Sequence, residues 1–228
     1  MMDASAIWIS MKTASVSIVI TFFLGIFAAW VVVSMQKEKL KVLIDGILTL
    51  PLVLPPTVAG FFLLYILGVQ RPLGKLLLAF FGVKVVFNWS ATVIAAVIIS
   101  FPLMYRSARG AFEQVDQTMI HAARTIGMSE FRIFWRIIMP LALPGVASGG
   151  ILAFARGLGE FGATAMIAGN IAGKTRTLPL AVYSAVAGGN MAGAYEYVGI
   201  LVGISFLVVV GMNWFTACER RYLGRGNN

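Results

Sequence analysis

Residues 14–35 read ASVSIVITFFLGIFAAWVVVSM, a stretch without a single charged side chain. A helix needs about 20 consecutive apolar residues to cross the hydrocarbon core of a bilayer, so this stretch predicts a membrane-spanning helix. The rest of the chain has a matching composition, because 59% of its 228 residues are hydrophobic and only 12% are charged. Soluble domains carry about 25% charged residues. We therefore expect a polytopic membrane protein and exclude a soluble enzyme.

Four further apolar stretches extend the pattern to an all-α membrane bundle, expected to form a single domain over residues 1–228. The five predicted spans are Ala14–Met35, Val42–Val69, Trp89–Met104, Leu141–Ile167 and Tyr197–Ala217. A shorter apolar stretch, Leu178–Ala187, is predicted to be re-entrant or interfacial because it is too short to cross alone.

The distribution of positive charge predicts the orientation of the bundle. Five spans place the two termini on opposite sides of the membrane. With the N-terminus outside and the C-terminus inside, 11 of the 18 Lys and Arg residues lie on the cytoplasmic side and six lie outside. The positive-inside rule favours this arrangement. The net charge of +9 is then mainly an orientation signal, and no basic groove with interleaved aromatic residues indicates nucleic-acid binding.

The segment Ala111–Pro140, between the third and fourth spans, is about thirty residues long, whereas helix connections are usually a few residues long. Asp116 suits the N-cap of a short helix, and Gly127 suits its C-terminus because glycine tolerates the left-handed conformation. Ser129 suits the N-cap of a second helix, which Pro140 is expected to end. The segment is thus predicted to be two short helices at the cytoplasmic surface. They serve either as an interfacial anchor or as a docking surface.

The small residues of this loop favour docking, since they let another protein approach closely. The loop resembles that of ABC importer permeases, whose signature is Glu-Ala-Ala, three residues, Gly and, about nine residues later, Ile-x-Leu-Pro. This chain reads His121-Ala122-Ala123, then Gly127, and later Ile138-Met139-Pro140-Leu141. It departs from the pattern at His121, where Glu is usual, and in its last four residues. In that family the loop is the coupling helix, so the resemblance assigns His121, Ala122, Ala123 and Gly127 to docking on an ATP-binding subunit.

Three other stretches narrow the family. Leu50–Gly60, Phe154–Ala163 and Lys174–Pro179 resemble the permeases for molybdate, tungstate and sulfate, and nearly the whole chain is most similar to the molybdate permease subunit. The resemblance implies a type I ABC importer permease fold in the cytoplasmic (inner) membrane, surrounded by lipid. It also implies a homodimer, two copies of an ATP-binding subunit, and a periplasmic or extracellular binding protein that delivers a tetrahedral oxyanion.

The chain has no phosphate-binding Gly-x-x-x-x-Gly-Lys-Ser/Thr motif. We therefore expect ATP and Mg²⁺ to bind to a partner subunit. The chain also has no Ser/His/Asp or metal-ligating constellation, so we expect no catalytic residue, cofactor or metal in it, which argues against a membrane-embedded enzyme. The alternatives are a permease for sulfate, thiosulfate or tungstate, and an ion-coupled secondary transporter. The second alternative predicts internal repeats and ion-binding carboxylates at mid-membrane, but only Glu160 lies well within a span.

Five residues are predicted to belong to the translocation path or its gate. Pro51, Pro55 and Pro56 remove backbone donors and should kink or break the second span, as a gate or as a fixed kink needed for packing. Arg156 and Glu160 are four residues apart and should share a helix face. Charges within a membrane often mark a pathway, so this pair is either a cationic element near the outer end of an anion path or a structural ion pair.

Overall fold

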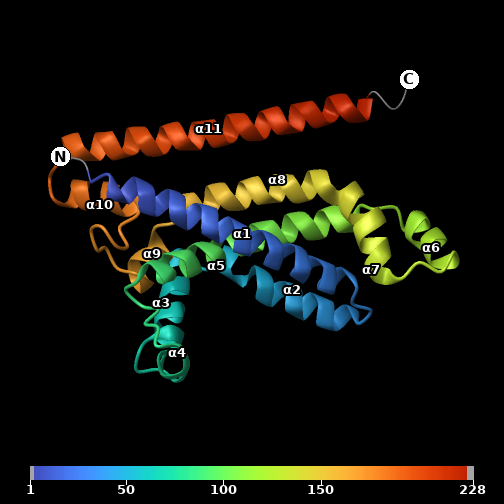
Figure 1. Cartoon of the computed structure of the whole chain (residues 1–228), viewed down its shortest axis with the longest axis horizontal. Helices are drawn as coiled ribbons and strands as arrows, with labels where there is room; N and C mark the ends of the chain where they lie inside the picture. Colours follow the sequence, from blue (N-terminus) through green and yellow to red (C-terminus); the bar gives the residue numbers. More distant parts are fainter. Residues whose placement is uncertain (1–2, 225–228) are drawn as a thin grey trace.

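The computed structural model describes residues 3–224, and every regular element in them is a helix. The elements are α1 (Ser5–Val33), α2 (Glu38–Val53), α3 (Pro56–Leu67), α4 (Pro72–Phe81), α5 (Trp89–Glu113), α6 (Gln117–Thr125), α7 (Glu130–Ile133), a π-helical turn η1 (Phe134–Ile138), α8 (Met139–Leu158), α9 (Gly162–Ile167), α10 (Leu178–Ala187) and α11 (Met191–Gly224). The long helices α1, α5, α8 and α11 run along the long axis of the molecule, with α6 and α7 at one end and α9 and α10 at the other (Figure 1).

Four helical stretches are long and apolar enough to cross a membrane, and the bent pair α2–α3 raises the number to five. The predicted all-α polytopic bundle is confirmed. The third and fifth crossing helices are longer than expected, since α5 continues to Glu113 and α11 begins at Met191. The predicted short piece Leu178–Ala187 is α10, which packs against α11.

A buried polar seam joins α1 to α5 at the centre of the bundle. The hydroxyl oxygens of Thr13 and Thr92 lie 2.9 Å apart, and those of Thr21 and Ser100 lie 3.1 Å apart. Small side chains let helix backbones approach closely in a bilayer, where hydrophobic burial does not drive association, and hydrogen bonds between them add stability. The seam therefore fixes the register of α1 on α5.

Glycines bring α8 equally close to α5. A methyl group added at Gly145 would lie 2.8 Å from the Cβ of Ala111, and one added at Gly149 would collide with the side chain of Ser107. The Gly145-x-x-x-Gly149 pattern thus serves helix packing, and α1, α5 and α8 form one closely packed unit.

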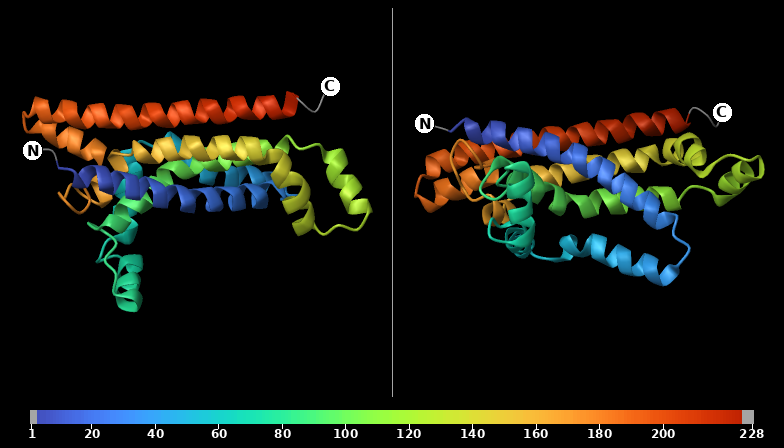
Figure 2. Two further views of the ribbon diagram at one scale, coloured as in Figure 1. Left: turned by 45° about the horizontal axis from the view of Figure 1, so that its top comes forward. Right: turned by 60° about the horizontal axis from the view of Figure 1, so that its bottom comes forward.

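The second predicted span is not one straight crossing. Its prolines break the helix as expected: Pro51 lies inside α2, Pro55 is the extended residue before α3, and Pro56 is the first residue of α3. The two helices are bent by 111°, and α3 and α4 project from the side of the bundle (Figures 1 and 2). At 16 residues, α2 is about 24 Å long, short of the roughly 30 Å hydrocarbon core. The apolar stretch Val42–Val69 is therefore broken at its prolines, as predicted, and forms the bent pair α2 and α3.

The chain stays helical across Pro140, where we expected a helix to stop. The N–H of Met139 bonds to the carbonyl of Phe134 five residues earlier, and Pro140 lies in the first turn of α8. A π-helical turn is wider than an α-helical turn, and it accommodates a proline that has no N–H to donate. One helical stretch therefore runs from Glu130 to Leu158.

The fourth predicted span ends earlier than expected. We predicted helix over Leu141–Ile167, but α8 ends at Leu158 and a separate short helix, α9, begins at Gly162. The interruption contains Glu160, whose carboxylate bonds to the backbone of α9. The two predicted spans that carry the predicted pathway residues, Val42–Val69 and Leu141–Ile167, are therefore both broken.

Candidate functional site

Local hydrogen bonds hold the two short helices of the cytoplasmic loop at one end of the bundle (Figure 1). As predicted, Asp116 caps α6: its carboxylate accepts a hydrogen bond from the N–H of Thr118 at 2.8 Å, which lowers the pKa of Asp116. Ser129 occupies the N-cap position of α7 but makes no side-chain cap bond. Instead, Arg124 of α6 donates hydrogen bonds to both carboxylate oxygens of Glu130, at 2.7 and 3.0 Å. This ion pair joins the end of α6 to the start of α7.

The spacing between Ala123 and Gly127 has a geometric origin. Gly127 has φ +79°, its N–H bonds to the carbonyl of Arg124 at 3.0 Å, and the N–H of Met128 bonds to the carbonyl of Ala123 at 3.1 Å. These two bonds define a Schellman motif, which needs a left-handed residue at the first position beyond the helix cap. The predicted helix end at Gly127 is confirmed. Ala123 lies four residues before Gly127 because its carbonyl accepts the hydrogen bond from Met128 that closes the motif.

The residues assigned to docking do not all face the same way. Ala123 is buried and packs with Ile120 in the main core, so it supports α6 from beneath and presents no surface to a partner. His121 and Ala122 are exposed. Ile126 was not among the predicted docking residues, although it is 78% exposed at the end of α6. We call the exposed residues His121, Ala122, Thr125 and Ile126 the coupling surface.

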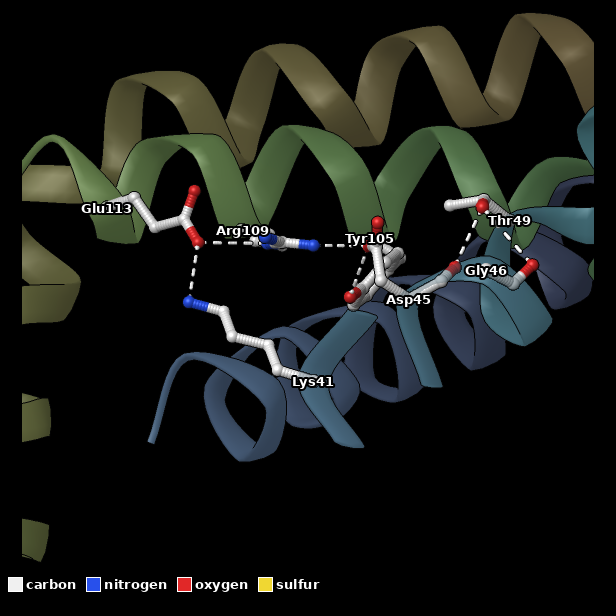
Figure 3. Close-up of polar contacts among 7 residues, drawn as sticks. All are labelled: Lys41, Asp45, Gly46, Thr49, Tyr105, Arg109 and Glu113. Atoms are coloured by element: carbon white, nitrogen blue, oxygen red, sulfur yellow. Dashed lines mark hydrogen bonds and ion pairs between the residues drawn. The ribbon is translucent and has the colours of Figure 1, made fainter. Parts of the chain in front are cut away.

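A chain of charges fastens α2 to the same end of α5 (Figure 3). The carboxylate of Asp45 accepts a hydrogen bond from the hydroxyl of Tyr105 at 2.9 Å and forms an ion pair with Arg109. The guanidinium of Arg109 also contacts Glu113 at 2.9 Å, and Lys41 reaches the same Glu113 oxygen at 3.3 Å. Hydrogen-bonded charge partners make such groups tolerable near a membrane. They explain why α5 continues through a charged stretch that we did not include in the third span.

At the other end of the bundle, the two broken spans meet. A methyl group added at Gly60 of α3 would lie 2.7 Å from the Cα of Ala163 in α9, and one added at Gly162 would lie 3.1 Å from the Cβ of Pro56. The backbones of α3 and α9 are therefore in direct contact. We call this contact the α3–α9 junction. Pro56, predicted as part of a gate, is one of its members.

The predicted Arg156–Glu160 pair lies beside this junction. The guanidinium of Arg156 donates to one oxygen of Glu160 at 2.9 Å, and the other oxygen accepts a hydrogen bond from the N–H of Ala163 at 2.8 Å. The residue Glu160 is only 3% exposed. Its carboxylate thus joins the last turn of α8 to the first turn of α9. Among the side chains that the structure describes, no group of three His, Cys, Asp or Glu residues is placed to hold a metal ion.

A family model described as "Binding-protein-dependent transport system inner membrane component" matches residues 21–222. The chain belongs to this family. It is 40% identical over 221 residues to the molybdenum transport system permease protein ModB of Escherichia coli (strain K12), covering 96% of both chains. It is 39% identical over 230 residues to ModB of Haemophilus influenzae, covering 99% of both. The predicted resemblance to the molybdate permeases is confirmed.

Solved structures support the fold of this inner-membrane permease. An inward-facing structure of the MetNI methionine ABC transporter matches with a TM-score of 0.75, covering 95% of each chain at 16% sequence identity. At that identity the likeness concerns the fold alone. The predicted type I ABC importer permease fold is confirmed.

Seen as a permease, the chain places its predicted site residues in two groups at opposite ends of the bundle. The coupling surface lies at the end that holds α6 and α7. Pro55, Pro56, Arg156 and Glu160 gather around the α3–α9 junction, and Pro51 lies earlier, inside α2. The assignment of these residues to docking and to a gate stays a prediction. The Asp45–Arg109 ion pair was not predicted. Asp45 lies near the start of the predicted span Val42–Val69, and a carboxylate in that position indicates a cationic partner.

Proposed function

We propose that this chain is the membrane-spanning permease subunit of an ATP-driven importer that carries molybdate across the cytoplasmic membrane. The observation that carries the proposal is identity of about 40% to molybdenum transport permeases over 96–99% of the chain. Similarity that covers every helix, including α6 and the α3–α9 junction, is expected of proteins that handle the same cargo through the same path.

The coupling surface supports an ATP-binding partner. His121, Ala122 and Ile126 are exposed on a helix at the end of the bundle, and a large apolar side chain such as Ile126 is costly to leave in water. In the proposal, two copies of the ATP-binding subunit bind ATP and Mg²⁺, and each docks on one permease chain at this surface. The permease itself provides no catalytic residue or cofactor.

One helical stretch connects the coupling surface to the α3–α9 junction and can transmit a movement of α6. The Arg124–Glu130 ion pair ties α6 to the helical stretch Glu130–Leu158, which is about 43 Å long. Its far end carries Arg156, which holds Glu160 beside the α3–α9 junction. Closure of the ATP-binding subunits would move α6, and this stretch would move the junction with it. Hydrolysis would then reset the path to face inward.

In the same proposal, two copies of the permease form the path together in the lipid bilayer. A binding protein loaded with the anion docks at the end that holds α9 and α10. Strong selection by the binding protein leaves the permease to bind the anion weakly, because a tight site would not release it. The carboxylate of Glu160 gives no support to an ion-coupled secondary transporter, since both of its oxygens already have protein partners.

The test is reconstitution of the chain in proteoliposomes with a candidate ATP-binding subunit and a candidate anion-binding protein. We expect uptake of radioactive molybdate that needs ATP and the binding protein, and that stops when the phosphate-binding lysine of the ATPase is replaced. Unlabelled tungstate, sulfate and thiosulfate are added as competitors. Uptake of sulfate in preference to molybdate would correct the cargo. Uptake driven by an ion gradient without the ATPase would refute the proposal.

A further inference from the structure

A groove of about 660 Å³ runs between the second half of α5 and the first half of α8. Gly110 of α5 has no atom within 4 Å of where a Cβ would lie, so the groove is open there, whereas Gly145 of α8 lies at the close contact with Ala111 that bounds it. Asp116, the N-cap of α6, and Met119 of α6 also line it. The groove therefore extends along α5 and α8 to the loop that carries the coupling surface.

One cation in this groove has no ionic partner. Arg106 of α5 is exposed and lines the groove, and none of the ion pairs formed among the described side chains includes it. An arginine on a membrane-spanning helix avoids lipid and faces either a partner or a water-filled cavity. Ser148 and Gln114 also line the groove and offer hydrogen-bond donors. These groups suit an oxyanion, because a guanidinium matches its oxygen atoms.

The contrast with Arg156 strengthens this assignment. The guanidinium of Arg156 is bound to Glu160 at 2.9 Å, so an anion would have to compete with a buried carboxylate for it. Arg106 forms no ion pair of this kind, and the carboxylate of Asp45 nearby is already paired with Arg109. The nearest acidic member of the groove is Asp116 at its α6 end, where the carboxylate is engaged by the N–H of Thr118. A negative charge at that end would help to expel an anion.

We propose that this groove is the cytoplasmic half of the oxyanion path and that Arg106 contacts the anion as it leaves. The proposal rests on the proposed function for the identity of the cargo. Because Met119 belongs to α6 and Asp116 caps its first turn, movement of α6 by the ATP-binding subunit would change the width of the groove. The exit and the docking surface are thus two faces of one helix.

The first experiment measures ATP-dependent molybdate uptake by the complete importer. Arg106→Gln should lower the initial rate roughly tenfold, since a cationic cleft raises the local anion concentration by at least that factor, while Arg106→Lys should retain most of it. The matched control is Arg136→Gln, an exposed arginine outside the groove, which should transport at the wild-type rate. Co-purification with the ATP-binding subunit verifies assembly. A wild-type rate for Arg106→Gln would overturn the proposal.

The second experiment does not depend on the cargo. In a Cys218→Ala background, Ser148→Cys places a thiol in the groove, and anionic and cationic methanethiosulfonate reagents compete to label it. We expect the anionic reagent to be favoured and the preference to fall when Arg106→Gln is added. Ser34→Cys, an exposed site outside the groove, should show no such change. If Ser148→Cys is not labelled, or if Arg106→Gln leaves the preference unchanged, the groove is not the anion path, even if molybdate uptake is confirmed. Failure of wild-type uptake would instead refute only the proposed function.

Discussion

The N–H of Met128 donates a hydrogen bond to the carbonyl of Ala123 across 3.1 Å. The chain can close this bond because Gly127 between them adopts φ +79°. A residue with a Cβ pays about 1–2 kcal/mol in that conformation. The orientation of the coupling surface therefore depends on a single glycine that has open space around it.

Gly127→Val should displace the end of α6 and weaken coupling without unfolding the bundle. We expect ATP hydrolysis to continue while molybdate uptake per ATP falls, because the ATP-binding subunit would meet a displaced surface. The ratio of uptake to hydrolysis in proteoliposomes measures this effect. Gly203→Ala is the control, since that glycine lies inside α11 with no atom within 4 Å. If Gly127→Val couples as well as the control, the structural explanation of the glycine is wrong.

Removal of the Glu160 carboxylate should destabilise the protein by about 1–3 kcal/mol, because it leaves the guanidinium of Arg156 and the N–H of Ala163 without their acceptor. Glu160→Ala should therefore lower the melting temperature of the detergent-solubilised permease. The double variant Arg156→Met/Glu160→Gln should recover part of the loss, since neither charge remains. Normal stability combined with lost uptake in the single variant would favour a role in the path over a structural one.

The Asp45–Arg109 pair should contribute about 1 kcal/mol, typical of a partly exposed ion pair. A double-mutant cycle with Asp45→Asn and Arg109→Met, followed by thermal unfolding, measures the coupling energy. Tyr105→Phe removes only the hydrogen bond to Asp45 and should cost about 1 kcal/mol. Independent effects of the two charge variants would contradict the network drawn in Figure 3.

Gly60→Ala should separate α3 from α9. The added methyl group would lie 2.7 Å from the Cα of Ala163, which is backbone and cannot rotate away. Overpacking of this kind costs about 1–3 kcal/mol, so the melting temperature should fall. Gly199→Ala adds the same group to α11, where no atom lies within 4 Å, and should be tolerated. Equal stability of the two variants would show that α3 and α9 are less closely packed than the structure indicates.

Local chemistry was predictable from the sequence. The uncharged run at Ala14–Met35 revealed a span, and Asp116 and Gly127 were identified as helix ends because the side chain of Asp116 and the φ angle of Gly127 affect only the residues next to them in the chain. Pro140 misled the prediction, since a π-helical turn accommodates it. The sequence pattern does not reveal such a turn.

Long-range relationships were beyond the sequence patterns that we used. The 111° bend between α2 and α3 depends on where α3 finds a surface to pack on, and that surface is α9, about a hundred residues further along the chain. Likewise, α5 was cut short at its first charges because the partner of Arg109 is Asp45 on another helix. Single-sequence patterns detect periodicity and caps, but they do not detect pairs that meet only after folding.

The π-helical turn at Phe134–Ile138 has a consequence for the phase of the whole helical stretch. A π-helical turn accommodates one residue more than an α-helical turn, and one residue corresponds to a rotation of roughly 100° about the helix axis. The direction in which α6 and α7 face, relative to α8, is therefore set by residue count. Deleting one residue here and restoring regular α-helix would point the loop toward a different side of the bundle, with every contact residue still present in the chain.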